Sequence, residues 1–345
     1  MDRRSLLLGA AAVAVAGLMG GPAVAQDTTT FRVHQMLPPQ ATIPKNAIEP
    51  WTKRVEEASG GRLKFELYPA MQLGGAPPDL YDQAKDGVVD LIWTVLGYTP
   101  GRFPKSEVFE LPFLITNAEA SSVAFERYVE ENAMDEFAGV KLLCVHTHGP
   151  GLFHTKDPVT SLEDLKGMKI RGGSRIINDM LTRLGAEPVG MPVPQVPEAL
   201  TTGVISGTTI PWEVTPSLKV AELVNNHTGF SGPNGLYSQT FAFTMNLDKY
   251  NALPDDLKKI IDDNSGVPCA REFGKAMDAG DAVGLKIAQD HGNNIVTLDE
   301  AETARWKDAA QATVDQWYAD MQAAGVDGKA LHERAKALIA EETGG

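Results

Sequence analysis

The sequence predicts an α/β protein built as two lobes joined by a hinge. Strand and helix signals alternate from residue 30 to about residue 96, in an order that builds a parallel sheet through right-handed crossovers. A second alternating unit covers residues 161–211, and the pattern from Pro254 onwards is almost wholly helical. Because a strand at 240–246 can return the chain to the first unit, we expect two lobes connected at two places, with a ligand-binding cleft between them.

The first unit is predicted from the spacing of its apolar residues, which follows the helical period in some segments and the two-residue strand period in others. The helix over 47–59 ends at two glycines, which is typical of a helix C-terminus. Residues 62–68 alternate between apolar and polar as a half-buried strand does, and 88–95 form an apolar run typical of a buried strand. The other elements expected here are strands at 30–34 and 140–149 and helices at 78–86 and 118–134.

The second unit opens with a capped helical turn. Ser161 and Asp164 have the spacing of a capping box, and a short strand is expected at 168–171. Apolar residues then recur at three- and four-residue spacing over 174–184, which predicts a helix that stops at Gly185. Further elements are a strand at 187–191, a helix at 194–202 and a strand at 203–211, and two long helices at 299–324 and 329–342 end the chain.

Arg171 stands where a strand ends and a helix is about to begin. In an α/β domain this is the edge of the sheet where ligands bind. A guanidinium beside a helix N-terminus suits a carboxylate, because its planar fork matches both oxygens. The alternative is a surface arginine paired with a nearby acid, and this segment alone leaves both interpretations open.

Composition and the N-terminus limit where the protein works. The formal net charge of −14 argues against non-specific nucleic-acid binding, which needs a basic surface. Residues 1–25 combine paired arginines, a short apolar run and an Ala-Val-Ala cleavage signal, so we expect a signal peptide. The arginines at 3 and 4 also resemble a twin-arginine signal, and Sec and twin-arginine export both remain open. The mature chain is expected in the periplasm.

The chemistry-bearing residues do not form an enzyme or metal motif. No G-x-S-x-G, P-loop or G-x-G-x-x-G occurs, so we expect no enzyme. His146 and His148 alternate on a strand but lack the spacing of a zinc site, and neither a metal nor a cofactor is expected. Export permits a disulfide, but Cys144 and Cys269 are interpreted as separate thiols in preference to a bridge.

Several segments together resemble a known family. They are EEASGGRL at 56–63, YPAMQLGG at 68–75, LPF at 111–113, EDLKGMKIR at 163–171 and ALTTGVISG at 199–207. In this order and after a signal peptide, the chain resembles the solute-binding proteins of tripartite ATP-independent periplasmic (TRAP) transporters, the DctP family. The resemblance covers essentially the whole mature chain.

The resemblance implies a fold and a mode of action. The fold would be a two-lobed periplasmic binding protein, type II-like, with hinge strands and long C-terminal helices. The expected parts are lobe I at 26–148 and 236–277, lobe II at 149–235 and 278–330, and a C-terminal helix and tail at 331–345. The protein would be a monomer that captures an organic acid and delivers it to a TRAP permease of a small and a large membrane subunit. The alternative is a receptor that feeds a sensor or an ATP-driven importer.

The family pattern also implies the anchor for the ligand. The arginine of the KIR motif binds the ligand carboxylate in this family, and here it is Arg171. Two polar positions of the pattern are absent: Ile210 stands where an asparagine is frequent, and no arginine lies near Gly151 or Phe153. These departures favour a monocarboxylate with an apolar, aromatic or hydroxy/oxo body. The identity of the acid, and whether a cation binds with it, stay open.

Aromatic residues are the first candidates for the rest of the cleft. Trp93 and Tyr98 follow the third strand and could sandwich an aromatic solute, although core packing is the plain alternative for Trp93. Trp212 is interpreted as a lid over the ligand. Tyr237, just before the returning strand, is a further candidate, whereas Phe241 is assigned to the core.

Three titratable residues complete the candidate set. Glu213 could accept from a ligand hydroxyl, orient Arg171 or help hold a cation, and a structural salt bridge is the alternative. His34 ends the first strand and His148 lies near the hinge, so either imidazole could donate to the ligand. A lone histidine is also often a structural residue.

Overall fold

Two mixed β-sheets, one in each lobe, organise the molecule. The computed structural model describes residues 28–344, so the predicted signal peptide lies outside the described residues. The lobe I sheet has the strand order β2-β1-β3-β10-β4. Its strands are β1 (Thr29–Gln35), β2 (Leu63–Tyr68), β3 (Leu91–Val95), β4 (Val140–Thr147) and β10 (Thr240–Asn246). β1 is parallel to β2 and β3, whereas β10 runs antiparallel to β3 and β4. The returning strand predicted at 240–246 therefore lies inside this sheet.

The lobe II sheet has the order β11-β9-β5-β8-β6-β7. Its strands are β5 (Leu152–Thr155), β6 (Lys169–Gly172), β7 (Glu187–Gly190), β8 (Gly207–Ile210), β9 (Asn226–Phe230) and β11 (Asn294–Leu298). β6 pairs in parallel with β7 and β8, and β5 runs antiparallel to β8 and β9. This arrangement brings the ends of β6 and β8 next to each other at the face of lobe II that meets lobe I.

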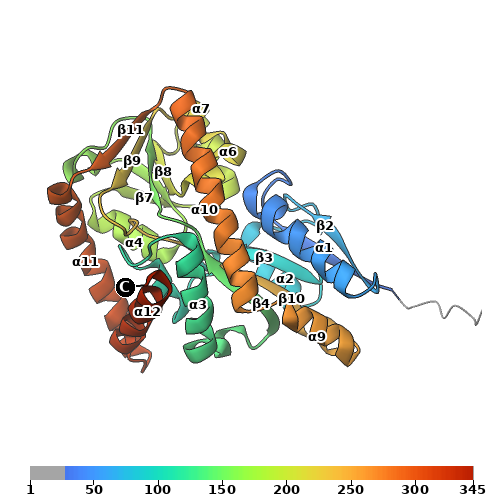
Figure 1. Ribbon diagram of the computed structural model, residues 1–345. Coiled ribbons are helices and arrows are strands. Elements are labelled where there is room, and N and C mark those ends of the chain that lie inside the picture. Colours follow the sequence, from blue (N-terminus) through green and yellow to red (C-terminus); the bar gives the residue numbers. More distant parts are fainter. Residues whose placement is uncertain (1–27, 345) are drawn as a thin grey trace, which may run out of the picture.

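Helices cover both sheets (Figure 1). They are α1 (Glu49–Ala58), α2 (Leu80–Lys85), α3 (Ala118–Asn132), α4 (Arg175–Arg183), α5 (Val196–Thr202), α6 (Thr215–Leu218), α7 (Val220–Leu223), α8 (Leu247–Asn251), α9 (Asp255–Asp263), α10 (Val267–Asp290), α11 (Glu300–Ala323) and α12 (Gly328–Thr343). The amphipathic pattern predicted over 174–184 is α4, whose Ser174 caps Ile177 N. α11 packs on α4, and α12 packs on α3. None of the described helices combines the length and apolarity that a membrane span needs.

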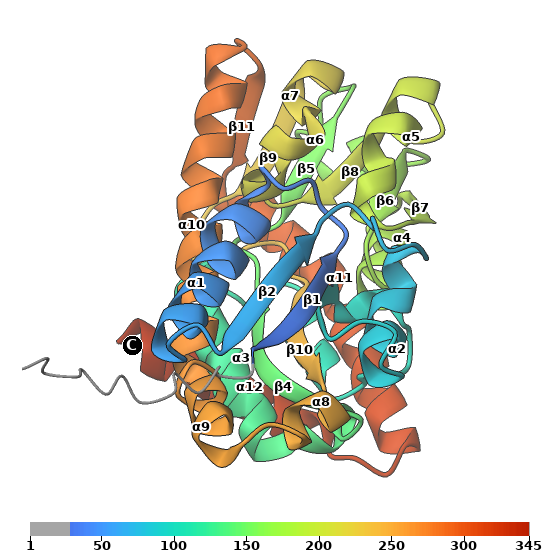
Figure 2. The ribbon, with the colours of Figure 1, turned by 90° about the vertical axis from the view of Figure 1, so that its right-hand side faces the viewer.

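The long helix α10 passes along both lobes. At about 1.5 Å per residue, its 24 residues extend over about 36 Å, and it follows one edge of the molecule from lobe to lobe (Figure 2). Its first half packs on α3, and its second half packs on the short 3-10 helix η8 (Trp212–Val214). Gly274 and Gly284 permit these contacts, because a Cβ would lie 2.6 Å from Ala118 O in the first case and 2.0 Å from Trp212 O in the second.

The lobes are also joined by two shorter segments. Residues 148–151 connect β4 to β5, and residues 231–239 connect β9 to β10. The predicted two-lobed α/β class is confirmed. The predicted lobe boundaries stay a prediction, and the two sheets separate residues 29–147 and 240–246 from residues 152–230 and 294–298.

The interpretation of the cysteines as separate thiols is wrong. Cys144 in β4 and Cys269 in α10 form a disulfide, with their Cα atoms 5.9 Å apart and 125 residues between them in the sequence. Each cysteine sits in an apolar run, and that local signal does not show which distant segment packs against it. The bridge fixes the first turn of α10 to the lobe I sheet.

Three strands of lobe II were not predicted. Residues 218–232, expected to be a helical turn and a connection, contain β9, and β11 lies in the region expected to be helical. The β9 sequence, NHTGF, contains asparagine and glycine, which are weak strand formers. Pairing with β5 and β11 satisfies its backbone. β11 is a five-residue edge strand between two long helices, and β5 has only four residues.

Candidate ligand-binding site

Arg171 lies at the end of β6 with its side chain fully buried, at 0% exposure. Its Nε donates to Met191 O at 2.9 Å, Nη1 to Thr209 O at 3.3 Å and Nη2 to Tyr98 Oη at 3.4 Å. No carboxylate among the described residues forms an ion pair with this guanidinium. The alternative of a surface arginine paired with an acid therefore does not describe this residue.

The hydrogen bonds of Arg171 leave two of its N–H groups without an acceptor among the described residues. A guanidinium has five N–H groups, and the three protein contacts take one each from Nε, Nη1 and Nη2. One N–H on each terminal nitrogen is left over, and two such groups can bind both oxygens of a carboxylate. Burying a charge without a counter-ion is costly. The guanidinium is therefore suited to an anion.

Tyr98 brings lobe I to this arginine. It ends the 3-10 helix η3 (Leu96–Tyr98), directly after β3. Its Oη accepts from Arg171 Nη2 and, at 2.8 Å, from Val193 N of lobe II. With two bonds accepted, the hydroxyl hydrogen remains to be donated. Burial raises the pKa of Tyr98, although the charge of Arg171 acts in the opposite direction, so that the phenol stays protonated and can act as a donor.

Two further donors come from the connection over 231–239. Tyr237 Oη and Gln239 Nε2 are buried and have no hydrogen-bond partner among the described residues. The nearby Thr209 hydroxyl donates instead to Arg171 O at 3.1 Å. The ring of Tyr237 fills the space beside Gly151, where a Cβ would lie 2.2 Å from the ring. The position that lacks the family's second arginine thus faces a tyrosine.

An apolar cavity lies beside these donors. Trp93 and Phe241 form its aromatic wall, with parallel rings 5.2 Å apart, and the ring of His146 stacks on Phe241 at 4.8 Å. The Trp93 indole N–H donates to His146 Nε2 at 2.8 Å, so the wall has no unpaired polar group. The other apolar residues that line it include Met36, Leu37, Val95, Val193, Ile210 and Met277. The free volume inside the cavity is about 30 Å³, which is about the share of one water molecule in the liquid. A substituted ring therefore requires these side chains to move apart.

His148 lines the same cavity but is fully engaged by the backbone. Its Nε2 accepts from Gln239 N at 3.0 Å, so Nδ1 carries the hydrogen and donates to Gly149 O. Burial, with the charge of Arg171 as a further cause, lowers the pKa of His148 to about 3. The neutral ring therefore holds the two lobe connections together and has no hydrogen left for a ligand.

Glu213 also lines the cavity and is 4% exposed. Its backbone N–H donates to Asp281 Oδ1 at 2.7 Å, whereas its side-chain Oε1 has no partner among the described residues. Burial, followed by the charge of Asp281, raises the pKa of Glu213 to about 8. No salt bridge involves this carboxyl in the described part of the chain. The salt-bridge interpretation thus finds no support.

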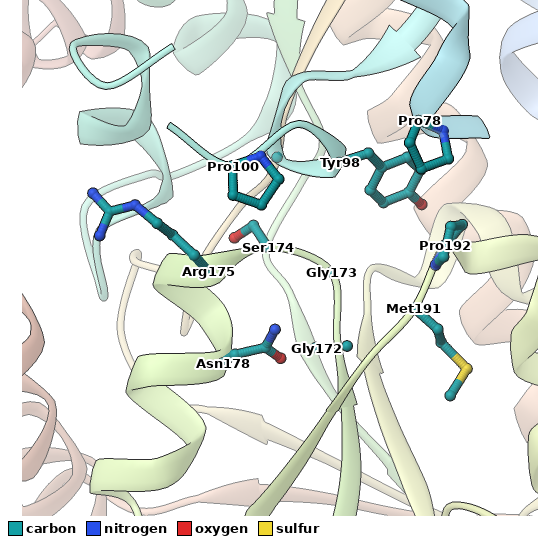
Figure 3. A pocket seen from close by; sticks show the side chains of 12 residues that line it. Pro78, Tyr98, Pro100, Gly172, Gly173, Ser174, Arg175, Asn178, Met191 and Pro192 are labelled. Atoms are coloured by element: carbon teal, nitrogen blue, oxygen red, sulfur yellow. The ribbon is translucent and has the colours of Figure 1, made fainter. Parts of the chain in front are cut away.

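A second pocket, which we call the mouth, lies between the lobes and shares Tyr98 with the cavity (Figure 3). Lobe I contributes Pro78 and Pro100, and lobe II contributes Asn178 and Met191. The guanidinium of Arg175 points away from the mouth (Figure 3) and pairs with Glu107 and Asp320, as expected for a helix that begins near Ser174. The lobes approach closely at Gly97, where a Cβ would lie 2.5 Å from Ser174 Cβ.

The sequence comparison identifies the family. The family model DctP, described as bacterial extracellular solute-binding protein, family 7, matches residues 33–320. The chain belongs to this family. The match covers both sheets of this DctP-family protein, so the predicted resemblance is confirmed.

Solved structures of TRAP solute-binding proteins superpose on this DctP-family protein. One from Rhodoferax ferrireducens T118, in complex with copurified benzoate, is 48% identical, with a TM-score of 0.90 over 92% of this chain and 99% of that one. One from a marine metagenome, specific for aromatic acid ligands and bound to 3-hydroxybenzoate, is 44% identical, with a TM-score of 0.90 over 92% and 99%. One from Bordetella bronchiseptica with bound (R)- and (S)-mandelate is 30% identical, with a TM-score of 0.84 over 91% and 99%. This family consists of solute receptors.

Four candidates from the sequence do not line the cavity of this DctP-family protein. Arg171 and Tyr237 lie directly behind its lining, against Tyr98 and His148 respectively, whereas His34 and Trp212 are engaged elsewhere. Both ring nitrogens of His34 are engaged within lobe I, Nδ1 with Gln83 Oε1 at 2.7 Å and Nε2 with Leu73 N at 3.3 Å. Trp212 packs its ring on His154 and His227, at 4.9 and 4.8 Å, and does not line the cavity. Its backbone neighbours Pro211 and Glu213 do line it. The position of the Trp212 ring therefore does not support a lid over the ligand.

Among the residues that line the cavity, one aromatic and one amide side chain were missed. Phe241 was assigned to the core, and Gln239 was not considered. Phe243, on the same strand, does pack in the core, with its ring 5.0 Å from that of Trp51. Their place in the sequence could have indicated a cleft position, because Gln239 ends the segment that crosses between the lobes and Phe241 follows it closely.

Proposed function

We propose that the protein captures an aromatic monocarboxylate in the periplasm, by pairing the carboxylate with Arg171, and delivers it as a monomer to a TRAP permease of two membrane subunits. The observation that carries the proposal is the buried guanidinium of Arg171, which has no carboxylate partner among the described residues and keeps one N–H group on each terminal nitrogen. The aromatic wall beside it and the aromatic acids bound by the similar TRAP proteins add support.

Each residue has a distinct part in this proposal. Arg171 binds both carboxylate oxygens, and the remaining hydrogens of Tyr98, Tyr237 and Gln239 are donated to the same group. The ligand ring packs beside Trp93 and Phe241, where apolar burial and ring geometry favour an aromatic body. Ile210 adds apolar surface in place of an amide, which disfavours a polyhydroxylated acid.

Closure of the lobes follows from the same contacts. Tyr98 belongs to lobe I, whereas its partners Arg171 and Val193 belong to lobe II. A ligand carboxylate bound by Arg171 and Tyr98 therefore makes contacts with both lobes only when they are together. Closure also removes water from the ion pair, which strengthens it. The ligand thus favours the closed form through its differential contacts.

The test compares ligands that differ in one property each. Calorimetry and thermal melting of the mature protein should give binding of benzoate, 3-hydroxybenzoate or mandelate, and no binding of benzamide, which keeps the ring but lacks the charge. Succinate, which keeps the charge and lacks the ring, should likewise not bind. A ligand at a hundredfold excess over its Kd should raise stability by about 2.7 kcal/mol. Absence of any shift with the aromatic acids, or equal binding of benzoate and benzamide, would refute the proposal.

A further inference from the structure

Glu213 is the one cavity residue with an unpaired carboxyl oxygen among those described. Its Oε1 has no hydrogen-bond partner, and the side chain lines the same cavity as Trp93 and Phe241. The carboxyl is packed between η8 and α10, since a Cβ on Gly280 would lie 2.7 Å from Glu213 Cγ. A buried polar atom without a partner is costly. The cavity therefore presents a second polar group that is suited to a ligand.

This group contacts other residues than the guanidinium does. Glu213 packs at Gly280 and its backbone N–H donates to Asp281, both on α10. Arg171 instead donates to Met191, Thr209 and Tyr98. The charge of Arg171 acts on the pKa values of Tyr98, Tyr237 and His148. The charge that acts on Glu213 is that of Asp281 on α10. A ligand whose carboxylate is held by Arg171 would therefore extend its other end toward Glu213. The apolar wall of Trp93 and Phe241 contributes to the lining between the two ends.

The chemistry of Glu213 selects a hydroxyl as its partner. Burial raises its pKa to about 8, so that the carboxyl is largely uncharged at neutral pH and can both accept and donate a hydrogen bond. A phenolic hydroxyl also does both, whereas a ring C–H does neither. No group of three or more acidic, histidine or cysteine side chains in the described residues could hold a metal ion.

We propose that Glu213 binds a hydroxyl group on the ligand ring, so that the protein selects hydroxylated aromatic acids over unsubstituted benzoate. This inference rests on the proposed function and specifies the ligand class of the same site. A site built around a hydroxyl discriminates strongly against a ligand that lacks it, because the protein group is then left unpaired.

The experiment compares a hydroxyl with a methyl group of similar size. Kd values are measured by calorimetry for 3- and 4-hydroxybenzoate, the two matching methylbenzoates and benzoate. The native protein should bind the better hydroxybenzoate at least about tenfold more tightly than its methyl counterpart. Glu213→Leu should reduce this ratio to within about threefold. Glu213→Gln should retain the preference, because an amide can also donate and accept.

A matched control separates the site from burial in general. Glu126 is another buried carboxyl with a pKa raised to about 8, and it accepts from Val145 N in lobe I at 2.7 Å, away from the cavity. Glu126→Gln should leave every ratio unchanged. A hydroxyl preference that survives Glu213→Leu, or its absence in the native protein, overturns the inference while aromatic-acid binding stands. Absence of binding by all five acids instead refutes the proposed function.

Discussion

Replacing Arg171 with lysine tests the anchor most directly. The guanidinium serves three protein acceptors and keeps two N–H groups for a ligand. A lysine ammonium has three donors from one atom and cannot reach Met191 O, Thr209 O and both carboxylate oxygens together. A bound carboxylate would lose its matched partner inside a desolvated site.

The size of the loss follows from the burial of this pair. Truncating one partner of a buried, hydrogen-bonded charge pair costs about 2–5 kcal/mol. At about 1.4 kcal/mol for each factor of ten, the Kd should rise roughly 30- to 4,000-fold. Because Arg171 is 0% exposed, solvent screening does not reduce this figure.

Calorimetry with 3-hydroxybenzoate measures this change in Kd. The control is Arg54→Lys, since Arg54 forms a two-pronged pair with Glu272 at 2.9 and 2.7 Å in lobe I and does not line the cavity. The control should bind with native affinity. If Arg171→Lys binds within about threefold of the native protein, the two-pronged carboxylate pairing is refuted.

Three further predictions follow from the fold. Replacing Cys144 with serine opens the 125-residue loop to Cys269 and should lower the free energy of unfolding by up to about 5 kcal/mol, as measured by urea unfolding against the oxidised native protein. Glu126 holds a proton in the folded state up to a pKa of about 8 and releases it near 4.5 when unfolded, so its contribution to stability is present below pH 4.5 and falls as the pH rises to 8. Glu126→Gln should therefore gain up to about 4 kcal/mol relative to the native protein between pH 5 and 8 in the same assay, and parallel curves would contradict this. Gly97→Ala places a methyl group against Ser174 across the cleft and should weaken ligand binding at least about tenfold by calorimetry, with an unchanged melting temperature without ligand; native affinity would show that the lobes need not approach this closely.

The sequence predicts the scaffold better than the lining of the cavity. The spacing of apolar residues and the residues that begin and end helices are local signals. They correctly predict α4 and the long helices α11 and α12. Arg171 was found for the same reason, because its position between a strand and a helix is visible in the segment itself. β9 and β11 were missed because their pairing partners, and not their own residues, make them strands.

Side-chain direction explains the remaining differences. Trp212 and Glu213 are adjacent in the sequence, yet one ring packs on His154 and the other side chain lines the cavity. Phe241 and Phe243 share a strand face, but only Phe241 reaches the edge where the lobes meet. Such choices depend on what the opposite lobe presents. They cannot be inferred from apolar character alone.

The course of α10 has a consequence for how solute enters. This helix is docked on lobe I at Gly274 and on lobe II at Gly284, and the disulfide at Cys269 pins its first turn. We therefore expect the distance between the two lobes to stay nearly constant along the margin beside α10. The opposite margin, at α2 and α4, lies on the far side of the molecule from α10 (Figure 2). Pro78, just before α2, and Asn178, on α4, line the mouth. We expect the distance between the lobes to change mainly at this free margin when ligand binds. A membrane partner that distinguishes the loaded from the empty receptor would then do so by contacting both lobes at this margin.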